Sequence, residues 1–485
     1  MASAETPLRF VDRVREIGFL NGALRRTHPG PGQLLLVYGR RRVGKSKLLL
    51  RWAEQSRVGS TYWVAEKEGP ALQRRKLYAK LMGVPVRQAP LFESWAELWD
   101  AVAALLEGRR HILILDELPY ASEADPAMLS ALQHAWDTHF QRSKVVLALC
   151  GSQVRTMEAL QLEQSPLFGR LTGRWHVEPL PYCALGAFLP GWSAEDRVAA
   201  YAVVGGIPAY LEWLDPRWSL AENLRRVVLS PGSMFSAEPA FLLYDEVREP
   251  QNYLSVLGAV GAGNHSLDEI ARATLIEKAH LSSYLVRLQE LRLVERRLPV
   301  TLSPSELRKS RRGRYHLSDA YFRFYFRFIA PYQSTLSFEA SRVAADIQGG
   351  LNAFVGATAF EDLARQWLVR KGRAGELPFK PDAVGSHWGA KVQADVVAIC
   401  ARSRDILIGE CKWTVAPVDE QDIRKLVEET APRVLQDLPG GGAGWVVHHA
   451  AFARSGFTRG ARAAMKKRGG ILIGLDQLDE ALSEE

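Results

Sequence analysis

Short, strongly apolar segments recur in the first third of the chain, and each ends in polar or glycine-rich residues. They cover residues 34–38, 111–115 and 145–150. Continuous apolar runs of this length are typical of strands buried on both faces of a parallel sheet. Residues 47–55, which follow the first run, have the pattern of a helix. The chain is therefore expected to begin with an α/β fold built on a parallel sheet.

The loop between the first expected strand and helix is rich in glycine and arginine, with the pattern G-x-x-x-x-G-K-S in a strand–loop–helix context. Glycines allow successive backbone N–H groups to face phosphate, Lys45 reaches the β- and γ-phosphates, and the Ser46 hydroxyl binds Mg²⁺. The alternative is a chance glycine-rich turn with a surface lysine, which the flanking elements disfavour. The residues expected to hold the nucleotide here are Gly39, Arg40, Arg41, Arg42, Val43, Gly44, Lys45, Ser46 and Lys47.

Asp116 and Glu117 follow directly on the second apolar run. A buried strand that ends in two carboxylates is what a Walker B segment requires. Asp116 would hold Mg²⁺, and Glu117 would polarise the attacking water. Taken alone, such a run is more often a strand entering a loop, but its pairing with a P-loop favours the functional interpretation. Together the two segments predict an enzyme that binds ATP with Mg²⁺ and hydrolyses it.

Polar residues also follow the third apolar run. Ser152 or Gln153 could sense the γ-phosphate, or could simply cap the helix expected from Val154. Two arginines, Arg170 and Arg174, lie in a glycine-punctuated loop further on. They are candidate arginine fingers for the nucleotide of a neighbouring subunit, and a solvated basic loop is the alternative.

Composition adds a few limits to this picture. The chain has 485 residues, a net charge of +8 at neutral pH and a pI near 9.2. The length suggests about three domains, and the charge permits nucleic-acid binding without requiring it. No long uncharged apolar run and no signal-peptide pattern occurs, so we expect no membrane span and a cytoplasmic location. The four cysteines lack C-x-x-C spacing, which argues against a disulfide framework or a structural zinc site.

Helical periodicity begins at Tyr253 and continues to Leu291, with short turns at residues 261–264 and 274–277. Two strands are expected next, at residues 293–300 and 313–317. Three helices and a hairpin suit a winged helix, and the loop within the hairpin is a basic tip (residues 308–314) suited to DNA phosphates. The basic residues of this tip are Arg308, Lys309, Arg311, Arg312 and Arg314. Winged helices also bind proteins, and that alternative stays open.

The aromatic stretch at residues 321–328 could stack on bases, but aromatic residues at helical spacing favour a core helix. We expect a linker around residues 331–350. A helix is predicted at residues 358–370, with Glu361 near its start, and hairpin strands at residues 392–399 and 405–413.

Charged residues interrupt the apolar strands of this hairpin. Glu410 and Lys412 share one face of their strand because side chains alternate, and Asp395 can lie across from them. The pattern D-x14-E-x-K resembles the core of PD-(D/E)XK nucleases. In that chemistry Asp395 and Glu410 would hold Mg²⁺ against the scissile phosphate, and Lys412 would assist formation of hydroxide. An exposed ion pair is the common alternative for E-x-K, and Gln393 replaces an acidic residue often found two positions before the aspartate.

Several motifs together resemble a known family. They are Phe10-Val11-Asp12-Arg13, the P-loop, Asp116-Glu117, Gly151-Ser152, Gly169-Arg170 and Gly205-Gly206-Ile207-Pro208. The set is similar to the prokaryotic, archaeal-type ATPase family of the AAA+/STAND group (DEXX-box ATPases), and the chain beyond residue 240 resembles its DUF234-type C-terminal region. The resemblance implies that Phe10 and Arg13 lie near adenine, that residues 184–245 form a helical lid, and that the C-terminal region has a restriction-endonuclease-like fold. Asp12 departs from the Gly or Asn common in the family.

The expected architecture is therefore a P-loop ATPase core (1–180), a helical lid (181–245), a winged helix (246–335) and a PD-(D/E)XK nuclease-like domain (336–485). Its expected function is ATP hydrolysis that drives or gates DNA engagement, in a homo-oligomer or ATP-dependent assembly. Glu361, Asp395, Glu410 and Lys412 are the candidate cleavage residues. The sequence leaves two alternatives open: a STAND-type signalling switch whose C-terminal domain binds but does not cleave, and a chaperone-like ATPase.

Overall fold

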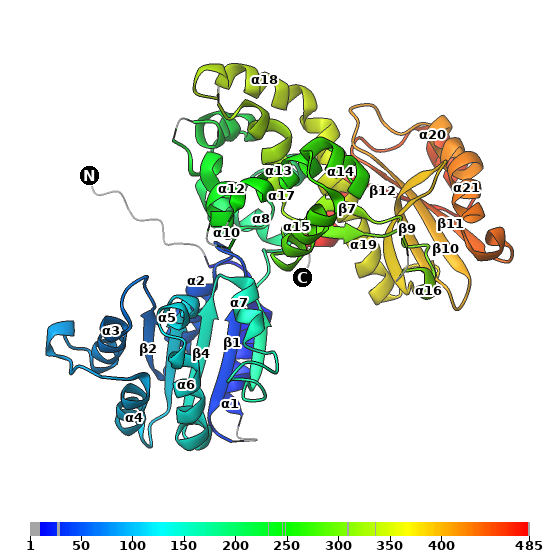
Figure 1. Ribbon diagram of the computed structural model, residues 1–485. Coiled ribbons are helices and arrows are strands. Elements are labelled where there is room, and N and C mark those ends of the chain that lie inside the picture. The colour runs from blue at the N-terminus through cyan, green and yellow to red at the C-terminus, as the bar shows by residue number, and fades with distance from the viewer. Residues whose placement is uncertain are drawn as a thin grey trace. The chain divides into compact units, whose positions relative to one another are not determined.

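A computed structural model describes residues 10–26, 30–230, 232–244, 246–247, 249–307, 310–334 and 336–483. The chain forms two compact units, which Figure 1 shows in sequence colours. Unit 1 holds residues 1–180 with 207–209, and unit 2 holds residues 181–206 with 210–485. The expected division into four parts remains a prediction.

Unit 1 is built on a five-stranded parallel sheet in the order β2-β3-β4-β1-β5. Every residue of β1 and β4 is buried, which agrees with the apolar runs in the sequence and with strands covered on both faces. Polar residues follow the carboxyl ends of β1, β3 and β4, where α/β sheets bind ligands. The strands are β1 (Gln33–Tyr38), β2 (Gly59–Val64), β3 (His111–Asp116), β4 (Val145–Gly151) and β5 (Gly173–His176).

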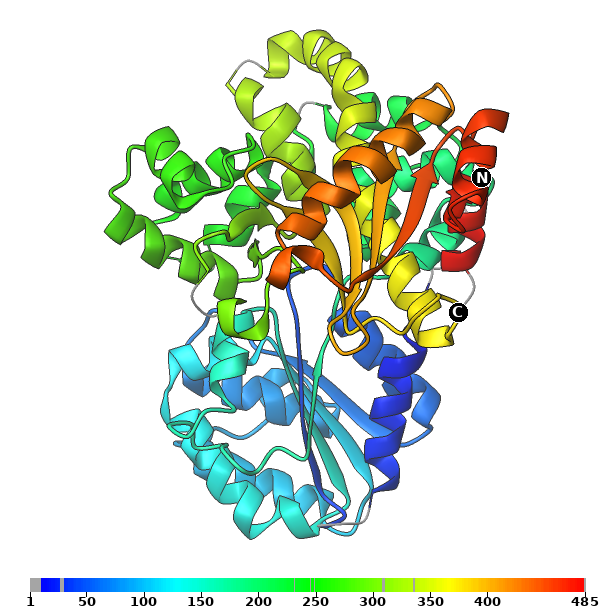
Figure 2. The same ribbon diagram turned by 90° about the vertical axis from the view of Figure 1, so that its right-hand side faces the viewer.

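Helices lie on both faces of this sheet (Figures 1 and 2). Trp95, Trp99 and Trp136 are buried in the core that these helices form with the strands. The Ser94 side chain accepts a hydrogen bond from the Glu97 N–H and so defines the start of α4. The helices are α1 (Val14–Arg25), α2 (Lys45–Ser56), α3 (Pro70–Met82), α4 (Trp95–Leu106), α5 (Leu118–Ala124), α6 (Ala127–Thr138) and α7 (Val154–Ala159).

Unit 2 begins with helices and continues into three further helices and a two-stranded antiparallel sheet, in which β6 pairs with β7. The first set is α8 (Leu185–Phe188), α9 (Ala194–Val204), α11 (Leu220–Asn223) and α12 (Met234–Tyr244), and α10 (Pro208–Trp213) spans the boundary between the units. The second set is α13 (Pro250–Gly261), α14 (Leu267–Thr274), α15 (Lys278–Glu290), β6 (Val294–Arg297), α16 (Pro304–Leu307) and β7 (Arg314–Leu317). A capping box of Ser266 and Glu269 starts α14.

The aromatic stretch after β7 is a core helix, as expected. It comprises α17 (Ala320–Phe324) and a π-helical turn (Tyr325–Ile329), and its aromatic side chains are buried. The prediction of a linker around residues 331–350 is wrong. Residues 336–355 form α18 (Leu336–Val355), and Val343, Ile347 and Val355 are buried on one face of it. These positions follow the spacing of an amphipathic helix.

A second five-stranded sheet, in the order β12-β11-β10-β9-β8, completes unit 2. Its strands β8, β9 and β10 are antiparallel neighbours, whereas β10, β11 and β12 are parallel. Helices α20, α21 and α22 cover one face with Ile423, Val434 and Met465, and α19 packs on β8 and β9 (Figure 2). The elements are α19 (Glu361–Ala374), β8 (Ala383–Trp388), β9 (Gln393–Cys400), β10 (Asp405–Lys412), α20 (Glu420–Lys425), α21 (Ala431–Gln436), β11 (Val446–Ala453), α22 (Arg459–Lys466), β12 (Ile471–Gly474) and α23 (Leu475–Ser483).

Within the described ranges, no helix has the length and apolar character needed to cross a membrane.

Candidate functional site

The glycine-rich loop of unit 1 connects β1 to α2, as the P-loop pattern predicts. Gly44 has φ 92°, a left-handed conformation that glycine adopts without strain, and it directly precedes the first turn of α2. Lys45 is buried, and its Nζ donates to the Arg40 carbonyl at 3.1 Å, so the lysine side chain folds back over the loop. The free backbone N–H groups at the start of a helix are suited to binding phosphate.

The other basic residues of the loop differ in exposure. Arg41 is exposed, Arg40, Arg42 and Lys47 are half-buried, and Val43 is fully buried. Gly39 lies where the loop passes β5, and a Cβ there would lie 2.3 Å from the Val177 carbonyl oxygen. The chain needs glycine at this position because the two backbones approach so closely.

Asp116 receives several hydrogen bonds at the end of β3. The Ser46 hydroxyl donates to Asp116 Oδ2 at 2.7 Å, and the Tyr62 hydroxyl donates to the same oxygen at 2.5 Å. The Glu117 N–H donates to Oδ1 at 2.9 Å. Burial and Asp116 raise the pKa of the Tyr62 phenol, so Tyr62 remains a donor. Ser46 and Asp116, predicted to share a metal ion, are therefore in direct contact.

Glu117 lies between β3 and α5 with φ 50°, a left-handed conformation that is uncommon outside glycine. Its Oε2 accepts from both the backbone N–H and the hydroxyl of Ser152, at 3.2 and 3.0 Å. These bonds fix the carboxylate between the carboxyl ends of β3 and β4. Ser152 was a candidate nucleotide sensor, and its observed contact is with Glu117.

The N-terminal residues Phe10 and Arg13 differ in their surroundings. Phe10 is 37% exposed, whereas Arg13 is buried. The Arg13 guanidinium donates to the Val43 carbonyl at 2.8 Å, to the Glu178 carbonyl at 2.9 Å and to Glu16 at 2.8 Å. Arg13 thus stabilises the backbone of the P-loop. Its expected position near adenine remains a prediction.

Both candidate arginine fingers have partners within unit 1. Arg170 forms a bidentate contact with Asp137, with distances of 2.7 to 3.1 Å. Arg174 lies on β5 and donates to Gln161 at 2.7 Å. A role in trans would require Arg170 to leave Asp137, and the finger assignment stays a prediction for both residues.

Tyr62→Phe removes one hydrogen bond to a buried carboxylate. We expect the free energy of unfolding to fall by about 0.5–3 kcal/mol, since hydrogen bonds to charged groups lie at the upper end of this range. Urea denaturation of the full chain measures this. Tyr78→Phe removes a hydroxyl elsewhere in unit 1 and serves as the control. Equal stability of the two variants would contradict the role given to Tyr62.

The second group of predicted residues lies on the sheet of unit 2. The pairing of β9 with β10 reaches Val396 and Gly409, so Asp395 and Glu410 are the next residues on facing strands. Lys412 Nζ lies 3.1 Å from Glu410 Oε1, and Asp395 Oδ2 accepts from the Cys411 N–H at 3.1 Å. The three residues predicted from the D-x14-E-x-K pattern are thus brought together.

Glu361 enters this group from the first turn of α19. Arg365, one turn further on, lies 3.4 Å from Glu361 and donates to the Asp395 carbonyl and the Ser386 hydroxyl, both at 2.8 Å. It also donates to Asp362 at 2.5 Å. Arg365 therefore ties α19 to β8 and β9.

The carboxyl groups of this cluster repel one another. Burial and Asp395 raise the pKa of Glu361 to about 8, and burial and Glu410 raise the pKa of Asp395 to about 6. Burial lowers the pKa of Lys412, but Glu410 outweighs it, and the net shift is upward. Partly buried carboxyl groups with raised pKa values, such as those of Glu361 and Asp395, are typical of functional sites.

Three contributors were missed by sequence reasoning. Tyr62 carries no motif, because only the pairing of β2 with β3 brings its hydroxyl to Asp116. Arg365 could have been found from its i, i+4 spacing to Glu361 on a helix. Asp362 lies beside Glu361 in the sequence, but its role depends on guanidinium groups from distant elements.

Comparison with known proteins places this geometry in a family. Residues 10–214 match the model of an ATPase domain predominantly from Archaea, and residues 325–426 match DUF234, described as archaeal and bacterial proteins of unknown function. The uncharacterized protein MJECL04 of Methanocaldococcus jannaschii is 32% identical over 426 residues, which cover 87% of this chain and 90% of that protein. The chain belongs to the archaeal-type ATPase family with a DUF234 region. The match to residues 10–214 of this ATPase supports nucleotide binding in that part of the chain.

Solved structures with similarity to this ATPase were also found. The Walker-type ATPase PABY2304 of Pyrococcus abyssi is 20% identical, with a TM-score of 0.47, and the match covers 66% of this chain and 96% of that one. The ORC2 protein of Aeropyrum pernix, in ADPNP–ADP complexes, is 14% identical, with a TM-score of 0.43, over 71% of this chain and 98% of that one.

Proposed function

We propose that this ATPase hydrolyses ATP with Mg²⁺ and uses the nucleotide state to control binding of DNA by unit 2, where a metal-dependent site cleaves the strand. The observation that carries the DNA half of the proposal is the meeting of Asp395, Glu410 and Lys412 on facing strands with Glu361 on the adjacent helix. The chain thus contains a candidate ATP site and a candidate site for DNA phosphates. Their presence in one chain favours coupling between ATP hydrolysis and DNA binding.

In unit 1, some residues bind the phosphates and the metal ion, and another residue accepts a proton. Lys45 and the helix start hold phosphate, and Ser46 and Asp116 supply a hydroxyl and a carboxylate oxygen, the hard donors that Mg²⁺ prefers. Glu117, fixed by Ser152, orients the attacking water and accepts its proton. When bound, Mg²⁺ would neutralise charge on the phosphates.

In unit 2, α13, α14 and α15 with β6 and β7 have the element order of a winged helix. Arg311 is an exposed residue of the expected basic tip, and Arg308 and Lys309 lie outside the described residues. Arg312 donates to the Trp388 carbonyl and lies 3.4 Å from Asp437, so it points toward the C-terminal sheet. Arg312 is therefore less available to contact DNA phosphates at the tip.

Asp395 and Glu410 are the residues that would hold Mg²⁺ at the sheet. Among the described residues, no group of three or more His, Cys, Asp or Glu is placed to hold a metal ion. Two carboxylates suffice for Mg²⁺, which keeps several waters and takes phosphate oxygens as further ligands. The metal would supply Lewis-acid stabilisation of the phosphate. Lys412 stabilises negative charge on the attacked phosphate, and Asp395 and Glu410 orient the group that attacks.

The test uses the full chain with supercoiled and linear DNA, Mg²⁺ or Mn²⁺, and with or without ATP. We expect the wild type to cleave DNA and the Lys412→Ala variant to lose cleavage. In the Lys45→Ala variant we expect the cleavage rate to be the same with and without ATP. Lys380→Ala, which removes an exposed lysine of unit 2, should cleave normally. DNA-stimulated ATP hydrolysis without cleavage would overturn the nuclease role and leave a switch that binds DNA. Absence of both would overturn the proposal as a whole.

A further inference from the structure

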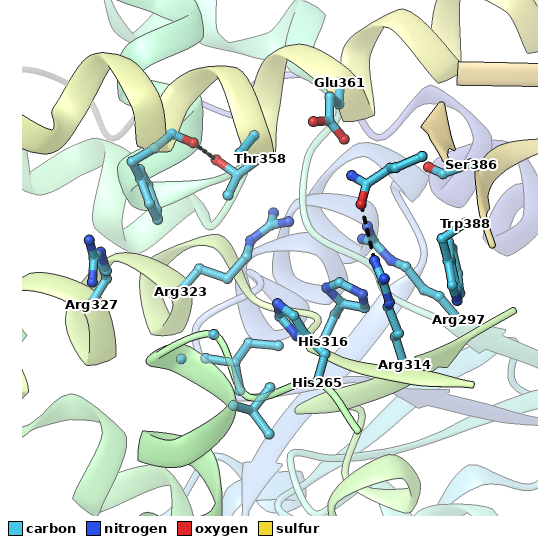
Figure 3. A pocket seen from close by; sticks show the side chains of 17 residues that line it. His265, Arg297, Arg314, His316, Arg323, Arg327, Thr358, Glu361, Ser386 and Trp388 are labelled. Atoms are coloured by element: carbon cyan, nitrogen blue, oxygen red, sulfur yellow. Dashed lines mark hydrogen bonds between the residues drawn. The ribbon is translucent and has the colours of Figure 1, made fainter. Parts of the chain in front are cut away.

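Unit 2 contains a basic cavity of about 330 Å³ beside the carboxylate cluster. Four arginines line it: Arg297 from β6, Arg314 from β7, Arg323 from α17 and Arg327 from the π-helical turn. Figure 3 shows their side chains gathered around the cavity, with Glu361, Ser386 and Trp388 along one side. Glu361 and Ser386 also belong to the surroundings of the candidate cleavage site, so cavity and site are continuous.

Arg314 and Arg327 have no ion pair with a carboxylate in the part of the chain that the structure describes. Arg314 donates to Gln393 at 3.2 Å and lies 5.0 Å from the centre of the Trp388 ring. Burial lowers the pKa of Arg314, although Glu269 partly opposes this shift. Arg327 lies 5.8 Å from the Phe328 ring. Arg314 is partly buried and Arg327 is exposed. A partly buried guanidinium with neutral partners, such as that of Arg314, is stabilised by an anionic ligand.

Arg297 and Arg323 have an acidic partner that they share with Arg365. Asp362 lies 3.0 Å from Arg323, 3.6 Å from Arg297 and 2.5 Å from Arg365, so one carboxylate serves three guanidinium groups. Arg297 also pairs with Glu295 at 2.6 Å. The Nε of Arg323 is buried and has no hydrogen-bond partner among the described residues. A buried donor of this kind points to a ligand with acceptor oxygens.

The imidazole of His316 reports the positive field in the cavity. Burial lowers the pKa of His316 to about 3, assisted by Arg297, His265, Arg323 and Arg314, so the imidazole stays neutral. Glu361 is the acidic residue of the described lining, and it lies 3.4 Å from Arg365, a guanidinium outside the lining. The lining thus contains four arginines and one glutamate, and the side chain of Gln393 can hydrogen-bond to a polar ligand.

We infer that this cavity binds the phosphate group and attached nucleoside of a single nucleotide. Arginine side chains match phosphate oxygens in paired hydrogen bonds. A cavity of this volume accepts a small ligand or one nucleotide drawn out of a strand. The inference rests on the proposed function, because the expected ligand is a nucleotide of a DNA strand that continues to Asp395 and Glu410. A free nucleotide has the same chemistry, and the test separates the two sources.

The test uses the full chain with Lys45→Ala, which removes nucleotide binding at the P-loop. Binding is measured for dAMP, for deoxyadenosine and for a fluorescent single-stranded oligonucleotide at one fixed salt concentration. Arg314→Gln and Arg327→Gln should each weaken binding of the phosphorylated ligand about tenfold. Arg402→Gln removes the same charge from an exposed position of unit 2 and should leave binding unchanged. Deoxyadenosine, which lacks phosphate, should bind at least about tenfold more weakly than dAMP.

The outcomes separate the two proposals. Binding of the oligonucleotide or of dAMP that is weakened by the cavity variants supports the cavity site, and the ligand that binds identifies the source. Oligonucleotide binding that Arg314→Gln and Arg327→Gln leave unchanged overturns the cavity site and leaves the proposed function standing. Binding of dAMP alone supports the cavity but contradicts the proposed role for DNA. Absence of binding by either ligand overturns the inference.

Discussion

Glutamine in place of Glu117 lowers the rate of ATP hydrolysis about 10²–10⁴-fold, the usual contribution of a general base, while ATP binding is retained. The amide cannot accept the proton of the attacking water, but it can still accept a hydrogen bond from Ser152, whose N–H and hydroxyl hold Oε2. The backbone at Glu117, with φ 50°, is left unchanged. Steady-state hydrolysis and equilibrium binding of a fluorescent ATP analogue together measure the two effects.

Two companion variants sharpen the Glu117 result. Glu123→Gln alters an exposed glutamate on α5 and should hydrolyse ATP at the normal rate. Ser152→Ala removes the hydroxyl but keeps the N–H bond to Glu117, so its rate should fall between the wild type and Glu117→Gln. A rate in Glu117→Gln equal to that of the wild type would show that another group accepts the proton.

The sequence predicts the parallel sheet of unit 1 well because its strands are buried on both faces. Continuous apolar runs then coincide with β1, β3 and β4, and the polar residues that follow them meet at one edge. Ser46, Asp116 and Glu117 belong to motifs whose spacing is local. Tyr62 belongs to no motif, since its contact with Asp116 depends on the neighbouring strand.

The prediction was poorer where tertiary packing decides the structure. The region expected to be a linker is α18, a helix whose stabilisation comes from burial of one face rather than from local signals. The arginines of the basic tip were predicted to suit DNA phosphates, and the pattern gave no sign that Arg312 and Arg314 contact Trp388 and Gln393 of the sheet β12-β11-β10-β9-β8. The basic cavity joins residues more than 100 positions apart, from Val260 to Gln393, and no local pattern could indicate it.

Asparagine in place of Asp395 stabilises the protein while removing the proposed cleavage activity. The folded-state pKa of Asp395 is about 6, above its ordinary 3.8, because burial and Glu410 disfavour the charged form. The folded state therefore loses stability as the pH rises from about 4 to about 6, and the loss persists above this range. Asp395→Asn should raise the free energy of unfolding at pH 8 by up to about 3 kcal/mol, with little effect at pH 4. Chemical denaturation with EDTA present measures this.

Asp405→Asn is the matched control at the other end of the same strand. Ser403 and His448 lower the pKa of Asp405, and the His448 ring lies 3.1 Å from its carboxylate, so the charge at this position is favourable. Asparagine there should reduce stability at pH 8, the opposite sign from Asp395→Asn. The carboxyl groups around Asp395 destabilise the folded state. Selection for stability does not explain such a cluster, whereas binding of a cation does. Destabilisation by both variants would show instead that Asp395 is a structural partner of the Cys411 N–H.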